Sequence, residues 1–99
     1  MISIEIGTDI LINIEVNELN IENVKYFQEK ISSSALEHNK NILINMEKVN
    51  FIDSAGISML LRLIQRCSGE KRKIEFKNIT PGVWDTIKMV NLHRFFKII

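Results

Sequence analysis

Several residue types that mark whole classes of protein are scarce in this chain. Its 99 residues include one cysteine and one proline, and no apolar run is long enough to span a bilayer. The single cysteine excludes an internal disulfide and a cysteine-based metal site. Lysine and arginine (13) nearly balance aspartate and glutamate (12), so the net charge of +1 gives no reason to expect nucleic acid as a partner.

Signals for catalysis and for export are also absent from the sequence. The two histidines, His38 and His93, do not have the spacing of metal ligands, and there is neither a G-x-S-x-G elbow nor a glycine-rich phosphate loop. The N-terminus lacks the basic start of a signal peptide. We therefore expect a cytoplasmic, non-enzymatic protein without a cofactor, a metal or a membrane-inserted segment.

What the sequence does contain is the composition of a folded domain. Hydrophobic residues make up 45% and charged residues 25% of the chain, proportions that argue against disorder. A chain of 99 residues has room for one modest hydrophobic core. We expect a single domain over residues 1–99, without repeats, linkers or low-complexity segments.

Hydrophobic periodicity predicts two strands and a long helix in the first part of the chain. Apolar residues alternate with polar ones over 2–6 and 10–16, and the Gly7-Thr8-Asp9 turn between them indicates a hairpin. Asn20 is the expected N-cap of a helix that continues, with apolar residues every three or four positions, to about Glu37.

The remaining chain predicts a parallel crossover unit and one more helix. A strand over 41–46, a helix over 54–67 and a strand over 73–77 follow one another, so the two strands are expected to be parallel, the first of them buried on both faces. Thr80-Pro81 predicts the start of a third helix, and 95–99 a short last strand. The order predicts an α/β fold: a mixed four- to five-stranded sheet with helices packed mainly on one face.

The junction Asp53-Ser54-Ala55-Gly56 is the most informative motif. It opens the second helix, so Ser54 lies where free N–H groups and partial positive charge favour a phosphate. A phosphate on Ser54 would accept hydrogen bonds from the N–H groups of Ala55, Gly56 or Ile57. Ser54 is either a helix cap or a phosphorylated switch. Asp53 either favours the turn or positions the Ser54 hydroxyl. Gly56 either relieves crowding against the sheet or lets a partner backbone approach.

The second helix carries more apolar residues than one face can hold. The stripe predicted to face the core is Ile57, Leu60, Leu61 and Ile64. The residues off this stripe that could contact a partner are Ser58, Met59, Arg62 and Leu63. Because Met59 and Leu63 are four residues apart, they either form one exposed apolar ridge beside Arg62 or pack under a neighbouring helix.

The sequence resembles the STAS domain family, the bacterial anti-sigma factor antagonists, over nearly its whole length. The most specific match is Val49 to Ile57, which is similar to the family signature hydrophobic-x-Asp-Ser-Ser/Thr-Gly-hydrophobic. Asn78 to Val83, Asn91 to Phe96 and Asn17 to Asn20 give weaker matches. Asn91 stands where the family has glycine, and asparagine also tolerates the left-handed backbone of such a turn.

The resemblance implies a STAS fold and a phosphorylation switch. Family members bind a serine protein kinase that is also the anti-sigma factor, and this releases the sigma factor. The kinase phosphorylates the serine after the aspartate, here Ser54. A PP2C-type phosphatase removes the phosphate and restores the unmodified serine. Ala55 leaves Ser54 as the only hydroxyl of the motif. The resemblance further implies that Asp53 and Gly56 support the phosphosite, that Asn20 and the second helix contact the kinase, and that the protein is a monomer or weak dimer.

A second interpretation comes from the accessory subunits of ABC-type phospholipid transport complexes. STAS proteins of that kind are similar in length and often carry Asp-Ser/Thr-Ala/Gly-Gly before a leucine-rich helix. Here Ala55 and the run Met59-Leu60-Leu61 fit that description. The sequence leaves these two interpretations open, together with a third, a subunit of a larger stress-signalling assembly built from STAS domains.

Overall fold

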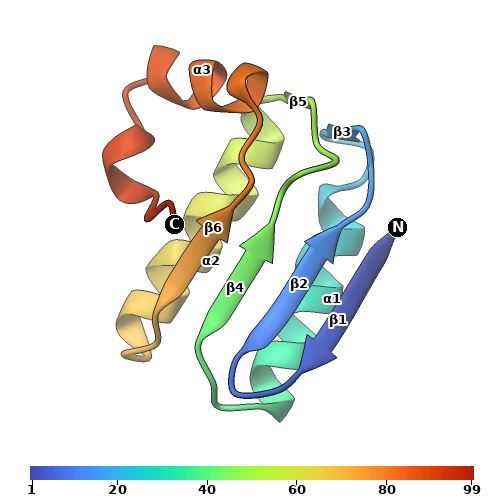
Figure 1. Cartoon of the computed structure of the whole chain (residues 1–99), viewed down its shortest axis with the longest axis vertical. Helices are drawn as coiled ribbons and strands as arrows, with labels where there is room; N and C mark the ends of the chain where they lie inside the picture. Colours follow the sequence, from blue (N-terminus) through green and yellow to red (C-terminus); the bar gives the residue numbers. More distant parts are fainter.

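A computed structural model describes residues 1–99 and shows strands and helices alternating along the chain (Figure 1). The elements in chain order are β1 (Ile2–Ile6), β2 (Ile10–Ile14), β3 (Glu18–Leu19), α1 (Val24–Glu37), β4 (Ile42–Asn45), β5 (Phe51–Ile52), α2 (Ser54–Gly69), β6 (Ile74–Lys77), α3 (Pro81–Met89) and the 3₁₀ helix η1 (His93–Phe95). None of the helices is both long and apolar enough to cross a membrane.

A four-stranded sheet in the order β1-β2-β4-β6 organises the fold. β1 and β2 are antiparallel, whereas β2, β4 and β6 are parallel, so the predicted hairpin and the predicted crossover unit are both confirmed. Helices α1 and α2 lie together behind one face of the sheet (Figure 1). The expected α/β class, with a mixed sheet and helices on one face, is confirmed.

The alternation of isoleucines explains why one face of the sheet is covered. Ile10, Ile12 and Ile14 of β2 are fully or almost fully buried, because they point toward the helices. The expectation that β4 is buried on both faces is only partly correct, because Asn45 is buried whereas Leu43, on the same face, is not fully so. Leu43, which pairs with Leu11 of β2, is only half-buried, because its face of the sheet is not the one that α1 and α2 cover.

A second, two-stranded sheet at the carboxyl edge of the first was not predicted. In it, β3 pairs in parallel with β5, so that Glu18 lies opposite Phe51 and Leu19 opposite Ile52. This pairing brings the segment before α1 against the segment before α2. It therefore joins the two loops on which the sequence placed functional residues.

At the C-terminal end, the predicted start of the third helix is correct and the predicted last strand is wrong. Helix α3 begins at Pro81 after Thr80, as predicted, and Asn91 has the left-handed backbone expected of it (φ 58°). The predicted last strand over 95–99 is instead a 3₁₀ turn followed by a single parallel bridge between Phe76 and Ile98. Phe96 is buried beside Phe76, which fixes this segment along β6.

Candidate functional site

Asp53, and not Ser54, caps helix α2. Asp53 has extended backbone geometry, and its Oδ1 atom accepts a hydrogen bond from the backbone N–H of Gly56 at 2.9 Å. Ser54 is the first residue of the helix, and its side chain is exposed to solvent. The interpretation of Ser54 as the cap is therefore wrong. The cap hydrogen bond belongs to its neighbour, and the Ser54 hydroxyl faces outward.

The second carboxylate oxygen of Asp53 holds the loop before α1. Its Oδ2 atom accepts a hydrogen bond from the backbone N–H of Ile21 at 3.0 Å. One side chain thus links the start of α2 to a segment more than 30 residues away in sequence (separation 32). Asp53 therefore does stabilise the turn at the helix N-terminus, one of the two roles that the sequence left open. The structure adds its hydrogen bond to the loop before α1.

Asn20 does not cap α1, which begins at Val24 with Asn23 as its N-cap. Asn20 lies in the preceding turn, where its Oδ1 atom accepts from the N–H of Glu22 at 3.0 Å and its backbone oxygen accepts from the N–H of Val24 at 3.0 Å. Asn20 remains half-exposed. The later helix start leaves Ile21 outside the core, with 71% of its surface exposed.

Gly56 is buried at the closest approach between α2 and the two-stranded sheet. A Cβ atom at this position would lie 2.6 Å from Cγ1 of Ile52 and 2.7 Å from the backbone oxygen of Leu19. The crowding role of this glycine is therefore present. The alternative role, in which a partner backbone approaches Gly56, is wrong because the residue is not accessible.

Helix α2 buries only part of the stripe predicted to face the core: Ile57 and Leu60 are buried, as predicted, but Met59 and Leu63 are buried with them. Met59 and Leu63 are buried, with 0% and 5% of their surfaces exposed, so the predicted apolar ridge does not exist. Leu61 and Ile64, predicted to face the core, are only half-buried. The alternative that Met59 and Leu63 pack inside the protein is correct, and neither can contact a partner directly.

Two of the predicted contact residues on α2 do face solvent. Ser58 and Arg62 are exposed, and the Nη2 atom of Arg62 donates to Oε1 of Gln28 on α1 at 3.3 Å. Because Ser58 lies four residues after Ser54, the two hydroxyls are on the same side of the helix. Ser54, Ser58 and Arg62 therefore follow one another along an exposed line of α2.

Two exposed apolar side chains beside Ser54 were missed in the sequence. Ile21 and Phe51 have 71% and 51% of their surfaces exposed. Both belong to the junction, since Ile21 is bonded to Asp53 and Phe51 is in β5, immediately before it. A signal was present for Phe51. In the adjacent pair Phe51-Ile52 successive strand residues point to opposite faces, so only one of the two can enter the core.

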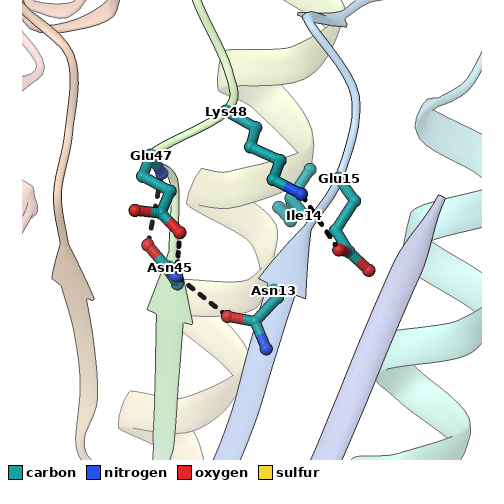
Figure 2. Close-up of a pocket in the computed structure, with 6 residues that line it drawn as sticks. All are labelled: Asn13, Ile14, Glu15, Asn45, Glu47 and Lys48. Carbon is teal, nitrogen blue, oxygen red and sulfur yellow. Dashed lines mark hydrogen bonds and ion pairs between the residues drawn. The ribbon is translucent and has the colours of Figure 1, made fainter.

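A polar recess of about 60 Å³ lies at the carboxyl ends of β2 and β4 (Figure 2). Its lining residues are Asn13, Ile14, Glu15, Asn45, Glu47 and Lys48. Asn45 is buried, and its side chain donates to Oδ1 of Asn13 (2.9 Å) and accepts from Nδ2 of Asn78 (3.0 Å). Lys48 pairs with Glu15 at 3.3 Å. These groups satisfy one another, so the recess ties together the ends of neighbouring strands.

Cys67 lies in the core and is not prepared for nucleophilic chemistry. Burial raises the pKa of its thiol above the ordinary value, and the positive charge of Arg72 offsets part of this effect. Because the thiolate is the reactive form, a raised pKa lowers its reactivity. No three His, Cys, Asp or Glu side chains lie close enough together to hold a metal ion.

Two replacements of Asp53 should distinguish the contributions of its two hydrogen bonds to stability. Asp53→Ala removes both, and losing an N-cap of this kind costs about 1 to 2 kcal/mol of unfolding free energy. Asp53→Asn keeps one oxygen that can accept from Gly56 but presents N–H donors to the N–H of Ile21. We expect its stability, measured by urea denaturation, to lie between those of the parent and Asp53→Ala.

Amide hydrogen exchange followed by NMR checks the assignment of the two bonds. In Asp53→Asn the amide of Gly56 should keep its protection while that of Ile21 loses it. Equal protection of both amides in the parent and in Asp53→Ala would contradict the bridging role.

The features together define an α/β domain that presents the start of a central helix, with an exposed serine, at the carboxyl edge of its sheet. The STAS domain profile matches residues 2–99, and the chain belongs to the STAS domain family. None of the curated proteins matches the sequence.

Solved structures share this fold. The anti-sigma factor antagonist SpoIIAA in its unphosphorylated form is 20% identical with a TM-score of 0.81, over 100% of this chain and 88% of that chain. The Thermotoga maritima protein TM1081 is 21% identical with a TM-score of 0.85, over 98% and 84%. The murine anion transporter Slc26a9 is 19% identical with a TM-score of 0.81, over 95% of this chain but 16% of the transporter.

Proposed function

We propose that this protein is an anti-sigma factor antagonist, a binding module and not an enzyme, that is switched by phosphorylation of Ser54. The unphosphorylated protein sequesters a serine protein kinase that also acts as the anti-sigma factor, and a PP2C-type phosphatase reverses the modification. The observation that carries the proposal is the exposed Ser54 side chain at the first position of α2, where Asp53 already provides the cap. The likeness to SpoIIAA, known in unphosphorylated and phosphorylated forms, supports it.

The geometry limits where a phosphate on Ser54 can be held. The N–H of Gly56 donates to the Asp53 side chain, and the N–H of Ile57 donates to the Asp53 backbone oxygen at 3.0 Å. The expectation that Gly56 and Ile57 bind the phosphate is therefore wrong for this conformation, and the N–H groups of Ser54 and Ala55 are the ones left at the helix start. The helix dipole favours the added charge, whereas the Asp53 carboxylate opposes it.

The switch acts at the surface and does not need refolding. A phosphate adds about 1.5 to 2 negative charges at an exposed position, where water screens its repulsion from Asp53. A partner that covers Ser54 would have to strip water from this dianion, and an unpaired buried charge costs several kcal/mol. Phosphorylation therefore weakens binding while the domain stays folded.

The exposed residues around Ser54 give such a partner its contacts. Ile21 and Phe51 provide exposed apolar side chains on the two segments that meet at Asp53, and Ser58 and Arg62 extend the surface along α2. Exposed large apolar side chains beside polar ones are typical of interfaces. Asn20, half-exposed in the turn held by Asp53, completes this surface.

Phosphorylation mapped by mass spectrometry tests the proposal. The protein is incubated with its cognate serine kinase, ATP and Mg²⁺, and the modified residues are identified from peptide masses. We expect one phosphate, on Ser54, and none on the Ser54→Ala variant. A phosphate on a different serine would contradict the role of Ser54. So would the absence of any phosphate on the protein when the kinase has fully phosphorylated a control substrate.

A second function is favoured by one structural comparison, since Slc26a9 shows this fold within a transporter. In that alternative the chain is an accessory subunit of an ABC-type phospholipid transport complex and uses the same surface around Ser54. Affinity purification from the native cell separates the two functions. Recovery of an ABC-type ATPase supports the alternative, whereas recovery of a kinase-like anti-sigma factor supports the switch.

A further inference from the structure

An apolar groove separates α2 from the C-terminal segment of the chain. Its volume is about 190 Å³, and it is lined by Leu61, Ile64, Gln65, Leu92 and Phe95. Leu61 and Ile64 are half-buried, and Phe95 has 48% of its surface exposed. The orientation of α2 that buries Met59 and Leu63 is what turns Leu61 and Ile64 toward this groove.

The size of the groove matches one large side chain. A protein cavity of about 150 Å³ lined by Leu, Ile and Phe accepts a benzene molecule. A volume of about 190 Å³ therefore accommodates a leucine or phenylalanine side chain. A recess of this kind receives a group that protrudes from a partner.

The two segments that line the groove carry charges of one sign. Helix α2 and residues 92–99 contain no aspartate or glutamate, although the whole chain is nearly balanced in charge. Their lysine and arginine residues are Arg62, Arg66, Arg94 and Lys97. Arg66 pairs with Glu70 at 3.3 Å and Lys97 with Glu75 at 3.4 Å.

Two of these four cations have no carboxylate partner within the chain. The guanidinium of Arg94 lies over the exposed ring of Phe95, 5.0 Å from its centroid, and Arg62 donates to the neutral side chain of Gln28. A guanidinium next to an apolar recess can bind a carboxylate in a bidentate manner while the recess holds a neighbouring apolar side chain.

We propose that the α2–η1 groove (Leu61, Ile64, Gln65, Leu92 and Phe95) binds an acidic peptide segment of a protein partner. The segment inserts one large apolar side chain between Ile64 and Phe95 and places a carboxylate near Arg94. Leu61 lies seven residues after Ser54, about 10 Å along the helix at 1.5 Å per residue. The groove is thus a contact surface separate from the Ser54 junction and does not depend on the proposed switch.

Peptides selected from a random phage-displayed library on the full chain test this proposal. The selected sequences should share one Leu, Ile, Met, Phe or Trp flanked by Asp or Glu, and NMR shifts on binding should concentrate at Leu61, Ile64, Leu92 and Phe95. Affinity measured by fluorescence anisotropy should fall as salt rises, because salt screens the charge attraction.

Surface variants separate the groove from the rest of the molecule. Gln65→Trp, which fills the groove from an exposed position, should lower the affinity at least tenfold, and Arg94→Glu should lower it severalfold. Lys25→Glu, on an exposed face of α1, is the charge-matched control and should have no effect, and Ser54→Asp should also have none. Circular dichroism spectra confirm that each variant is folded.

Three outcomes would overturn the proposal. The selection could enrich no peptide at all, or it could enrich peptides that lack acidic residues. Alternatively, the Gln65→Trp variant could bind the selected peptides as tightly as the parent does. Binding of the chain to vesicles that contain phosphatidylserine is measured for comparison with binding to the peptides. Binding of the chain to these vesicles through Arg94, with no peptide bound at the groove, would assign this basic surface to a membrane instead of a protein segment.

Discussion

Alanine in place of Gly56 should destabilise the protein more than any other small change near Ser54. The new Cβ atom would lie 2.7 Å from the backbone oxygen of Leu19 and 2.6 Å from Cγ1 of Ile52. The Ile52 side chain can rotate, but a backbone carbonyl in a paired strand can move only if β3 or α2 shifts. Overpacking of this kind costs about 1 to 3 kcal/mol. The melting temperature should therefore fall by roughly 5 °C or more.

Two other glycines of the chain, Gly7 and Gly69, provide matched controls for Gly56→Ala. A Cβ atom on Gly69, the last residue of α2, or on Gly7 would meet nothing within 4 Å, and neither glycine has a positive φ. Gly69→Ala should be neutral or stabilising by about 0.5 to 1 kcal/mol, because alanine favours the helix. If Gly56→Ala melted at the same temperature as Gly69→Ala, the close approach of α2 to β3 would be incorrect.

The regular elements could be predicted because single local signals determine them. The alternating isoleucines specify β1 and β2, and Thr80-Pro81 specifies the start of α3. The C-terminal segment could not be predicted in the same way. Its apolar residues allow a strand, but only one bridge forms, because Phe96 turns inward to pack on Phe76. That choice depends on a contact between residues 20 positions apart in sequence.

The orientation of α2 was predicted only in part because its apolar residues allow more than one buried stripe. At about 100° per residue, the face centred on Leu61 and Ile64 lies about 150° around the helix from the face centred on Met59 and Leu63. Contacts with α1 and with the sheet decide between the stripes, and neither is visible in the helix sequence. The same limit applies to Ile21, whose exposure follows from the Asp53 hydrogen bond that stabilises the turn before α1.

The position of Ser54 could be predicted, but its surroundings could not. The Asp-Ser-Ala-Gly order identifies a strand-to-helix junction, and the structure places Ser54 at the surface there. Which residue caps the helix depends on backbone geometry. With Asp53 extended and Ser54 helical, only the carboxylate of Asp53 reaches the N–H of Gly56.

Phosphorylation of Ser54 should lower the affinity for the proposed partner, an anti-sigma kinase, by at least about 100-fold, equal to about 2.8 kcal/mol. The reason is the desolvation of a dianion beside Asp53, in an interface that includes the exposed side chains of Ile21 and Phe51. Ser54→Asp adds only one charge and should have a smaller effect in the same direction. Ser54→Ala should bind as tightly as the unmodified protein. Isothermal titration calorimetry with the purified kinase gives the four dissociation constants.

The same charge placed elsewhere distinguishes a local effect from a general one. Ser33 is an exposed serine of α1, so Ser33→Asp changes net charge as Ser54→Asp does, but away from the junction. We expect Ser33→Asp to bind normally, since exposed charges separated by more than about 10 Å are screened at moderate salt. Equal weakening by both variants would mean that net charge controls binding. Weakened binding by Ser54→Ala would instead mean that the hydroxyl is itself a contact, and that phosphorylation removes it in addition to adding charge.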